Sequence, residues 1–115
     1  MEYTILILVN ATNQWLSLSR EDRDSFVERE LQPVFKKFSS SCKIRLFDSD
    51  FTHSTVSDFL IIETDNLKEY GYLIGYLRES KTFAIPYFEI KDLIIGVNNN
   101  FRGSLNIQNI TANLF

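Results

Sequence analysis

The chain has 115 residues, of which 44% are hydrophobic and 23% are charged, and its formal net charge at pH 7 is −3. This length suits one domain with a single hydrophobic core, and the composition excludes an intrinsically disordered chain. Acidic and basic residues are interspersed without a basic run, which excludes the charge pattern typical of a nucleic-acid-binding protein.

The first predicted element is a strand over residues 3–10 (YTILILVN), which is apolar on both faces, as in a central strand that is covered on both sides. The polar residues that follow predict a loop, which contains Trp15, the only tryptophan. Ser19 is the expected N-cap of a long helix. Pro33 should kink or break this helix, because proline cannot donate the helical hydrogen bond. The buried stripe of the helix is predicted to comprise Val27, Leu31, Val34, Phe35 and Phe38.

The remaining strands are predicted over three ranges, residues 42–48, 56–64 and 87–95. The first two of these are joined by a short polar link, which favours an antiparallel hairpin. Asp65 is the expected N-cap of a second helix, and residues 81–85 should form a loop after it. Gly71 and Gly75 lie four apart in this helix, which predicts that another segment packs closely against that side.

The element order β-α-β-β-α-β predicts an α+β, ferredoxin-like sandwich over residues 1–100, with the first and third strands central and both helices on one face. Both faces of the central strands are apolar, so the helix-free face should be covered by a second copy through a twofold axis. We therefore expect a homodimer of the dimeric α+β barrel type. Residues 101–115 form a C-terminal tail, which either frays or extends as an arm onto the partner subunit.

The cellular compartment is predicted from two negative observations. The apolar run from Ile5 to Val9 is far shorter than the roughly 20 residues of a membrane-spanning helix, and no basic segment precedes it as in a signal peptide. Cys42 is the only cysteine, so no intrachain disulfide forms. We expect a soluble cytoplasmic protein with no membrane partner.

Trp15 and two arginines mark the start of the first long helix. Trp15 lies where the chain crosses from the sheet to the helices, so it either plugs the end of the core or lines the mouth of a cleft. Arg20 and Arg23 are expected on a solvated helix face, where they pair with neighbouring acidic residues.

His53 and Asp58 are the candidate catalytic residues. His53 is the only histidine, and it precedes Asp58 by five residues on the predicted hairpin, where the carboxylate is close enough to orient the imidazole. The alternative is a loop histidine bonded to the backbone. Asp58 shares a strand face with apolar Leu60, which predicts partial burial and a partner, with Arg45 or His53 the nearest candidates.

The candidate ligand-binding residues are Trp15, Arg45, Tyr87 and Glu89. The alternation of Arg45 with apolar neighbours favours a solvent-facing side chain, whereas Tyr87 and Glu89 share a strand face and are expected to converge on one pocket. No metal site is predicted, because Cys42 and the single histidine lack the ligand spacing of zinc proteins. No cofactor is expected from any motif in the chain.

Three segments together resemble the darcynin family: residues 15–23 (WLxLSRExR), residues 51–58 (FxHxxVSD), and residues 77–80 (LRxS) followed by residues 86–90 (PYFEI), where x marks positions that do not carry the resemblance. The resemblance covers about residues 3 to 100. The family has no assigned biochemical activity, so the resemblance implies a fold rather than a reaction. The implied fold is that of the dimeric α+β barrels, a group that includes cofactor-independent oxygenases, isomerases and haem-degrading proteins.

Two principal functions remain open from the sequence. The first is the binding of a small apolar or aromatic molecule between sheet and helices, with cofactor-independent oxygenase or isomerase-like chemistry as an extension. The second is a non-catalytic homodimeric interaction protein, in which the aromatic residues only fill the core and the interface. A cleft of about 300 Å3 or more with polar groups turned inward would favour the first. A third hypothesis is haem binding through His53.

Overall fold

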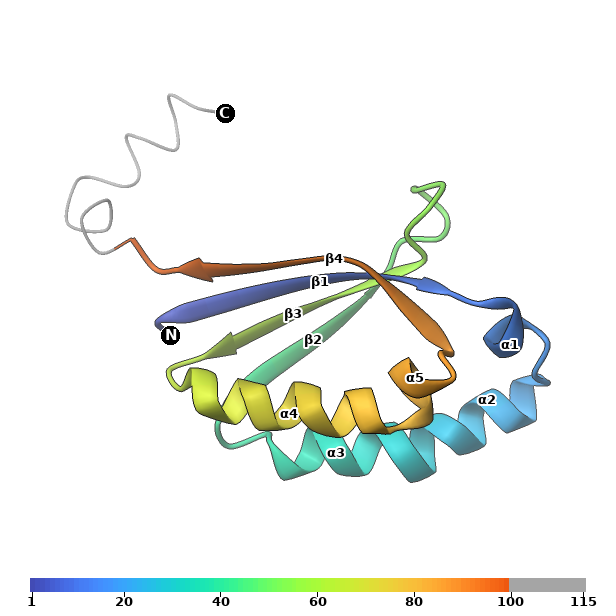
Figure 1. Ribbon diagram of the computed structural model, residues 1–115, viewed down its shortest axis with the longest axis horizontal. Helices are drawn as coiled ribbons and strands as arrows, with labels where there is room; N and C mark the ends of the chain where they lie inside the picture. Colours follow the sequence, from blue (N-terminus) through green and yellow to red (C-terminus); the bar gives the residue numbers. More distant parts are fainter. Residues whose placement is uncertain (100–115) are drawn as a thin grey trace.

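A computed structural model, which describes residues 1–99, contains one four-stranded antiparallel sheet with the strand order β2-β3-β1-β4 and helices on one of its faces (Figure 1). The central strands are therefore β1 and β3. The strands are β1 (Tyr3–Ala11), β2 (Cys42–Asp48), β3 (Asp58–Thr64) and β4 (Phe88–Val97). The helices are α1 (Asn13–Leu16), α2 (Arg20–Phe26), the π-helical segment η1 (Val27–Leu31), α3 (Gln32–Lys37), α4 (Leu67–Glu79) and α5 (Lys81–Ala84).

This architecture confirms the expected α+β, ferredoxin-like fold, including the hairpin of β2 and β3. All neighbouring strands are antiparallel, and a β-bulge interrupts the β1–β4 pairing beside Leu8. The expected C-terminal arm, residues 101–115, lies outside the described residues. Within residues 1–99, no helix has both the length and the apolar character that crossing a membrane requires.

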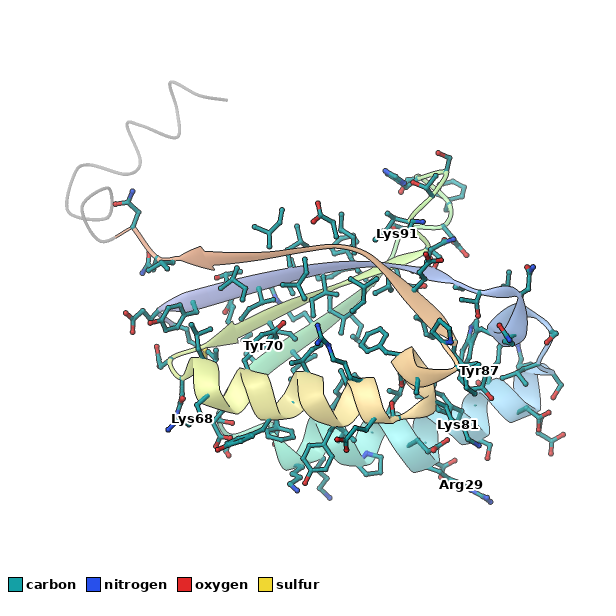
Figure 2. The ribbon with its side chains drawn as sticks, in the orientation of Figure 1. Arg29, Lys68, Tyr70, Lys81, Tyr87 and Lys91 are labelled. Atoms are coloured by element: carbon teal, nitrogen blue, oxygen red, sulfur yellow. The ribbon has the colours of Figure 1, made fainter. Side chains whose placement is uncertain are left out.

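The core lies between the sheet and the helices. Ile5, Ile7 and Ile62 project from the two central strands, and Leu73 and Leu77 meet them from α4; all five are almost completely buried. Tyr70 also points from α4 into this layer, as Figure 2 shows. Cys42 is buried in the same cluster, where it packs as a small apolar side chain.

Pro33 disturbs the first long helix as expected, but without ending it. The helix passes through the π-helical segment η1 before α3 begins, and the Gln32 N–H donates to the carbonyl of Val27, five residues earlier. Pro33 occupies the first turn of α3, where a missing N–H costs least. A π-helical turn therefore absorbs the register change that the proline imposes.

Two segments that were predicted as loops are short helices. Thr12 caps α1 by accepting a hydrogen bond from the Trp15 N–H, and Ser80 caps α5 by accepting one from the Thr82 N–H. The N-cap of α4 is Asn66 rather than Asp65, because Asp65 accepts a bond from the Glu2 N–H instead. All three caps are short polar side chains, but α1 and α5 are too short to show a helical period in the sequence.

The prediction of close packing at Gly71 and Gly75 is wrong within residues 1–99. A methyl group built on either glycine would meet no neighbouring atom within 4 Å, outside the helix itself. Tyr72, on the same helix, is 56% exposed. The two glycines therefore lower the helix propensity of α4 without allowing a close approach by another described segment.

The sheet face away from the helices is apolar at its centre. Leu6 pairs with Ile61 and with Ile94, and Leu8 pairs with Phe59, so these side chains share the face opposite to the core. Ile94 is 52% exposed. Among residues 1–99, Figure 1 shows no helix on this side, and the β2–β3 loop projects beyond it.

Ser19 supplies the first stability prediction. Its hydroxyl accepts a hydrogen bond of 3.1 Å from the Asp22 N–H at the start of α2. Ser19→Ala should therefore lower the free energy of unfolding by about 1 kcal/mol. Ser19→Asp should retain most of the stabilisation, because an aspartate also caps the helix. Urea unfolding of the three proteins measures the difference, and equal midpoints for Ser19→Ala and the parent would contradict the capping role.

Candidate functional site

A cleft of about 810 Å3 lies between the sheet and the helix layer. Most of its lining side chains are aliphatic or aromatic, and Leu46, which is 59% exposed, lines its open side. The sheet contributes Val9, Asn10, Ala11, Leu46, Phe47, Asp48, Asp58, Phe59, Leu60 and Phe88. The helices contribute Trp15, Leu16, Arg23, Val27, Leu31, Gln32, Phe35, Leu77, Thr82 and Phe83, and the β2–β3 loop contributes Asp50 and Ser57.

Trp15 lines the cleft, and its indole packs in an aromatic cluster outside the buried core. Its ring centroid lies 5.7 Å from Phe26, 5.5 Å from Tyr87 and 5.0 Å from Phe88. This aromatic cluster joins α1, α2 and β4, and it fixes the orientation of the indole. A half-buried indole that is held in place is a rigid wall for a ligand.

Arg23 is a cleft residue that the sequence placed on a solvated helix face. Its Nε donates to the carbonyl of Trp15 at 3.2 Å, and Nη2 donates to the carbonyl of Leu16 at 2.8 Å. The guanidinium carbon lies 5.7 Å from the centroid of the Trp15 ring. Arg23 therefore holds the end of α1 rather than pairing with an acid, which local sequence spacing does not reveal.

Asp58 lies at one end of the cleft, on the same sheet face as the core, and it is half-buried. Its Oδ2 accepts a hydrogen bond of 2.8 Å from the Ser57 hydroxyl, which in turn accepts one of 2.8 Å from the Ala11 N–H. Burial raises the pKa of the Asp58 carboxyl, the Ser57 hydrogen bond lowers it, and the charge of Asp48 raises it further. The partial burial was expected, but the partner is Ser57 rather than Arg45 or His53.

Two more carboxylates lie beside Asp58. Asp48 faces it across the β2–β3 pair, and the Asp50 N–H donates to Asp48 Oδ1 at 3.2 Å. The pKa of the Asp50 carboxyl is raised, first by a side-chain hydrogen bond with Asp48 and then by the charge of that residue. The mouth of the cleft therefore concentrates negative charge.

His53 lies in the exposed β2–β3 loop and does not line the cleft. Its Nδ1 accepts hydrogen bonds from the N–H groups of Thr55 at 3.2 Å and Val56 at 3.1 Å. Within residues 1–99 no hydrogen bond joins His53 to Asp58. His53 accepts from the Val56 N–H, and Asp58 accepts from the Ser57 hydroxyl. The geometry is that of a loop histidine bonded to backbone, and the expected acid–base pair is not assembled.

The other three candidate residues also lie outside the cleft. Arg45 is on the helix-free sheet face, where Nη2 forms an ion pair of 3.2 Å with Glu63 Oε1. Glu89 lies opposite Asn10 on that same face. Tyr87 precedes β4, packs on Trp15 and lines a separate hollow of about 340 Å3 near Lys81 (Figure 2). Tyr87 and Glu89 do not share a pocket, because Tyr87 lies outside the strand and its alternation.

Two polar features of the cleft complete its description. The Thr82 hydroxyl is the one buried side-chain polar atom within residues 1–99 for which no hydrogen-bond partner is found, and Thr82 lines the cleft. In the part of the chain that the structure describes, no group of three or more His, Cys, Asp or Glu side chains is arranged to hold a metal ion.

Comparison with known protein families identifies the family of this chain, and comparison with solved structures identifies proteins that share its fold. Residues 1–113 match the family described as "Darcynin, domain of unknown function". Darcynin 1 of Acinetobacter baumannii is 31% identical over 86 residues, which cover 75% of this chain and 94% of the relative.

Solved structures extend the comparison at the level of the fold. Chlorite dismutase from Candidatus Nitrospira defluvii matches with a TM-score of 0.73 at 12% identity over 84% of this chain. A protein from Thermus thermophilus, described as a novel heme-binding protein, matches with a TM-score of 0.74 at 13% identity over 84% of this chain. This chain spans only 40% and 39% of the lengths of those two chains. Such low identity shows a shared fold alone.

Proposed function

The chain belongs to the darcynin family, whose domain has no known function, so its role has to be inferred from its own cleft, and we propose that this cleft binds a small apolar or aromatic molecule. The observation that carries the proposal is the cleft of about 810 Å3 beside Trp15. Ligand sites of proteins are typically concave, largely apolar and between about 300 and 1,000 Å3 in volume.

The composition of the lining supports an apolar ligand body. Phe35 and Leu31 face the sheet from the helices, and Phe88 and Leu60 face the helices from the sheet. A flat or elongated apolar molecule between these walls would remove their side chains from water at about 25 cal/mol per Å2 of buried surface. The held indole of Trp15 would add contact area at little entropic cost.

Pairing of two copies through the helix-free sheet face is the second part of the proposal. That face has an apolar centre around Leu6, Phe59 and Ile61, and the Arg45–Glu63 ion pair lies on β2 and β3 beside it. An apolar centre with a polar margin is the usual anatomy of a protein interface. A second copy of the same face, related by a twofold axis, would cover the apolar centre.

A haem does not fit the residues of the cleft. Haem iron is held in proteins by His, Cys, Met or Tyr side chains, and none of these lines the cleft. The only histidine of the chain is His53, which lies in the exposed loop with its Nδ1 already hydrogen-bonded to backbone. The haem that the name of the Thermus protein mentions is therefore not part of the proposed function.

Catalysis is a separate question from binding. Of the candidate pair, only Asp58 lines the cleft, so proton transfer of the isomerase or oxygenase kind would have to use this carboxylate as the base. The alternative of a non-catalytic interaction protein requires that aromatic side chains fill the space between sheet and helices. The volume beside Trp15 favours ligand binding over that alternative.

Binding is tested with three probes that share one body: 3-phenylpropan-1-ol, 3-phenylpropylamine and 3-phenylpropanoate. Trp15 is the only tryptophan, so its emission reports on the cleft alone. We expect saturable changes with at least one probe, and about tenfold weaker binding to Val27→Phe, whose larger side chain occupies cleft space.

The matched control is Val97→Phe, which places the same side chain at the exposed end of β4 and should leave the affinity unchanged. The proposal fails if none of the three probes binds, or if both variants bind as tightly as the parent protein.

A further inference from the structure

We propose that the natural ligand of the cleft is an organic cation, an apolar or aromatic body that carries an ammonium group, and that this group pairs with Asp58 and Asp48. The inference rests on the proposed function, because it names the chemical class of ligand for the same cleft. Three observations support it. The cleft lining carries more negative than positive charges, the one cationic side chain of the lining already has hydrogen-bond partners, and a buried hydroxyl of the lining has no partner within residues 1–99.

The charges of the cleft do not balance. Its ionisable lining residues are three carboxylates, Asp48, Asp50 and Asp58, and one guanidinium, that of Arg23. The two ion pairs within residues 1–99 are Arg45–Glu63 and Lys91–Glu89, so no cation neutralises the three carboxylates in the part of the chain that is described. A positively charged ligand would complete the charge balance.

Arg23 is not available as the counter-ion of this cluster. Two of its nitrogens donate to the carbonyls of Trp15 and Leu16, and its guanidinium lies over the Trp15 ring. These contacts hold Arg23 at the α1 end of the cleft. Because Arg23 already uses these donors for backbone carbonyls, it is a poor main anchor for a carboxylate ligand.

The surroundings of Asp58 are those of a carboxylate that lacks a positively charged partner. Asp58 is half-buried, the Ser57 hydroxyl is its one hydrogen-bond donor within residues 1–99, and its pKa is raised by burial and by the charge of Asp48. A raised pKa means that the surroundings disfavour the ionised form of the carboxyl. An ammonium group placed between Asp48 and Asp58 would remove this penalty and form charge-assisted hydrogen bonds.

Thr82 is an independent sign that a polar ligand belongs in the cleft. Its hydroxyl is buried, the residue is 6% exposed, and the oxygen has no hydrogen-bond partner within residues 1–99. An unsatisfied buried polar group costs about 1 to 3 kcal/mol, so such groups normally have a partner. Thr82 lines the cleft, so rotation of its side chain would bring the hydroxyl to a ligand that carries hydrogen-bonding groups as well as an apolar body.

A metal cation does not meet these conditions. The carboxylates Asp48, Asp50 and Asp58 are not arranged as a metal-ligand group in the described residues, and the surrounding cleft is apolar. An ammonium group tolerates longer and fewer contacts than a metal ion, and its attached carbon body fills the volume beside Trp15. The ligand class that fits is therefore an amine rather than a bare ion.

The three probes introduced above test the inference, because they share an apolar body and carry a neutral, a positively charged or a negatively charged head group. We expect 3-phenylpropylamine to bind the parent protein at least about tenfold more tightly than 3-phenylpropan-1-ol, since charge-assisted hydrogen bonds are among the strong ones. The carboxylate 3-phenylpropanoate should bind most weakly. In Asp58→Asn the advantage of the amine over the alcohol should fall to about twofold or less.

Asp24→Asn is the matched control, because Asp24 is on α2 and does not line the cleft. It should keep the full advantage of the amine. Equal binding of amine and alcohol to the parent protein, or tightest binding of the carboxylate, overturns the cation inference and leaves the proposed function standing. Absence of binding by all three probes removes the proposed function itself.

The pH dependence provides a second readout. The amine stays protonated below neutral pH, so its advantage should fall as acidification protonates Asp58. Since the pKa of Asp58 is raised, the loss should begin above the range of an ordinary aspartate. The other ionisable groups that line this cleft are Asp48, Asp50 and Arg23. In Asp58→Asn, any remaining decrease in the amine's affinity advantage should occur at lower pH than in the parent protein. If this advantage depends on pH in the same way in the variant and the parent, the role of Asp58 is contradicted.

Discussion

Replacing Ile62 with alanine is expected to lower the free energy of unfolding by about 3 kcal/mol. Ile62 is completely buried on the central strand β3, where it pairs with Ile5 of β1 and Ile44 of β2. Its removal leaves a cavity in a layer that the neighbouring strands cannot close, and such substitutions cost about 2 to 5 kcal/mol. Chemical denaturation with linear extrapolation measures the loss.

Ile61→Ala is the control for this prediction, because Ile61 is the neighbour of Ile62 in the same strand and points to the opposite sheet face. At protein concentrations low enough to keep the chain monomeric, Ile61→Ala should cost less than about 1 kcal/mol. Equal losses for the two variants at low concentration would contradict the assignment of the core to the helix side of the sheet. At higher concentration the loss for Ile61→Ala should grow, because a proposed interface would then also be weakened.

The second large effect is expected from Ile61→Lys. The proposed twofold pairing places the helix-free faces of two copies against each other, and Ile61 lies near the centre of that face, beside Leu6 and Arg45. A lysine there would bring two unpaired positive charges into the interface, which costs several kcal/mol. Sedimentation equilibrium should show a dimer for the parent protein and a monomer for Ile61→Lys over the same concentration range.

Leu67→Lys is the matched control for this experiment. Leu67 begins α4 and is 37% exposed on the helix side of the molecule, so the same change of charge there should leave the dimer intact. The pairing proposal fails if the parent protein is monomeric at every concentration, or if both lysine variants remain dimeric. Because the cleft lies within one subunit, monomeric Ile61→Lys should still bind the phenylpropyl probes, which separates assembly from binding.

Much of the fold was predictable from periodicity. The alternation of Lys43, Ile44 and Arg45 predicted one exposed and one buried face for β2, and Ile44 faces the helices while Arg45 forms its ion pair on the other side. The apolar runs of β1 and β3 predicted their central positions. The effect of Pro33 was also predictable, although the π-helical turn that accommodates it was not.

Much less of the cleft was predictable. Trp15 and Asp58 were identified because a large aromatic in a polar segment and a charge on an apolar strand face are both unusual. Arg23 and Thr82 were missed, since a helix arginine among acids and a threonine near a strand have no distinguishing local pattern. His53 was singled out for its chemistry, but its loop bonds it to its own backbone.

The sequence by itself determined the order of the elements, the two apolar faces of the central strands and the membership of a family without a known function. Those properties are local or periodic, because each depends on residues within one strand or one turn. Only the tertiary structure decided which polar groups share a cleft. Asp48, Asp58, Arg23 and Thr82 come from β2, β3, α2 and α5, and they line one volume because the sheet and the helices pack at a particular distance and register. No local pattern encodes that distance, since it depends on side-chain packing across the whole core.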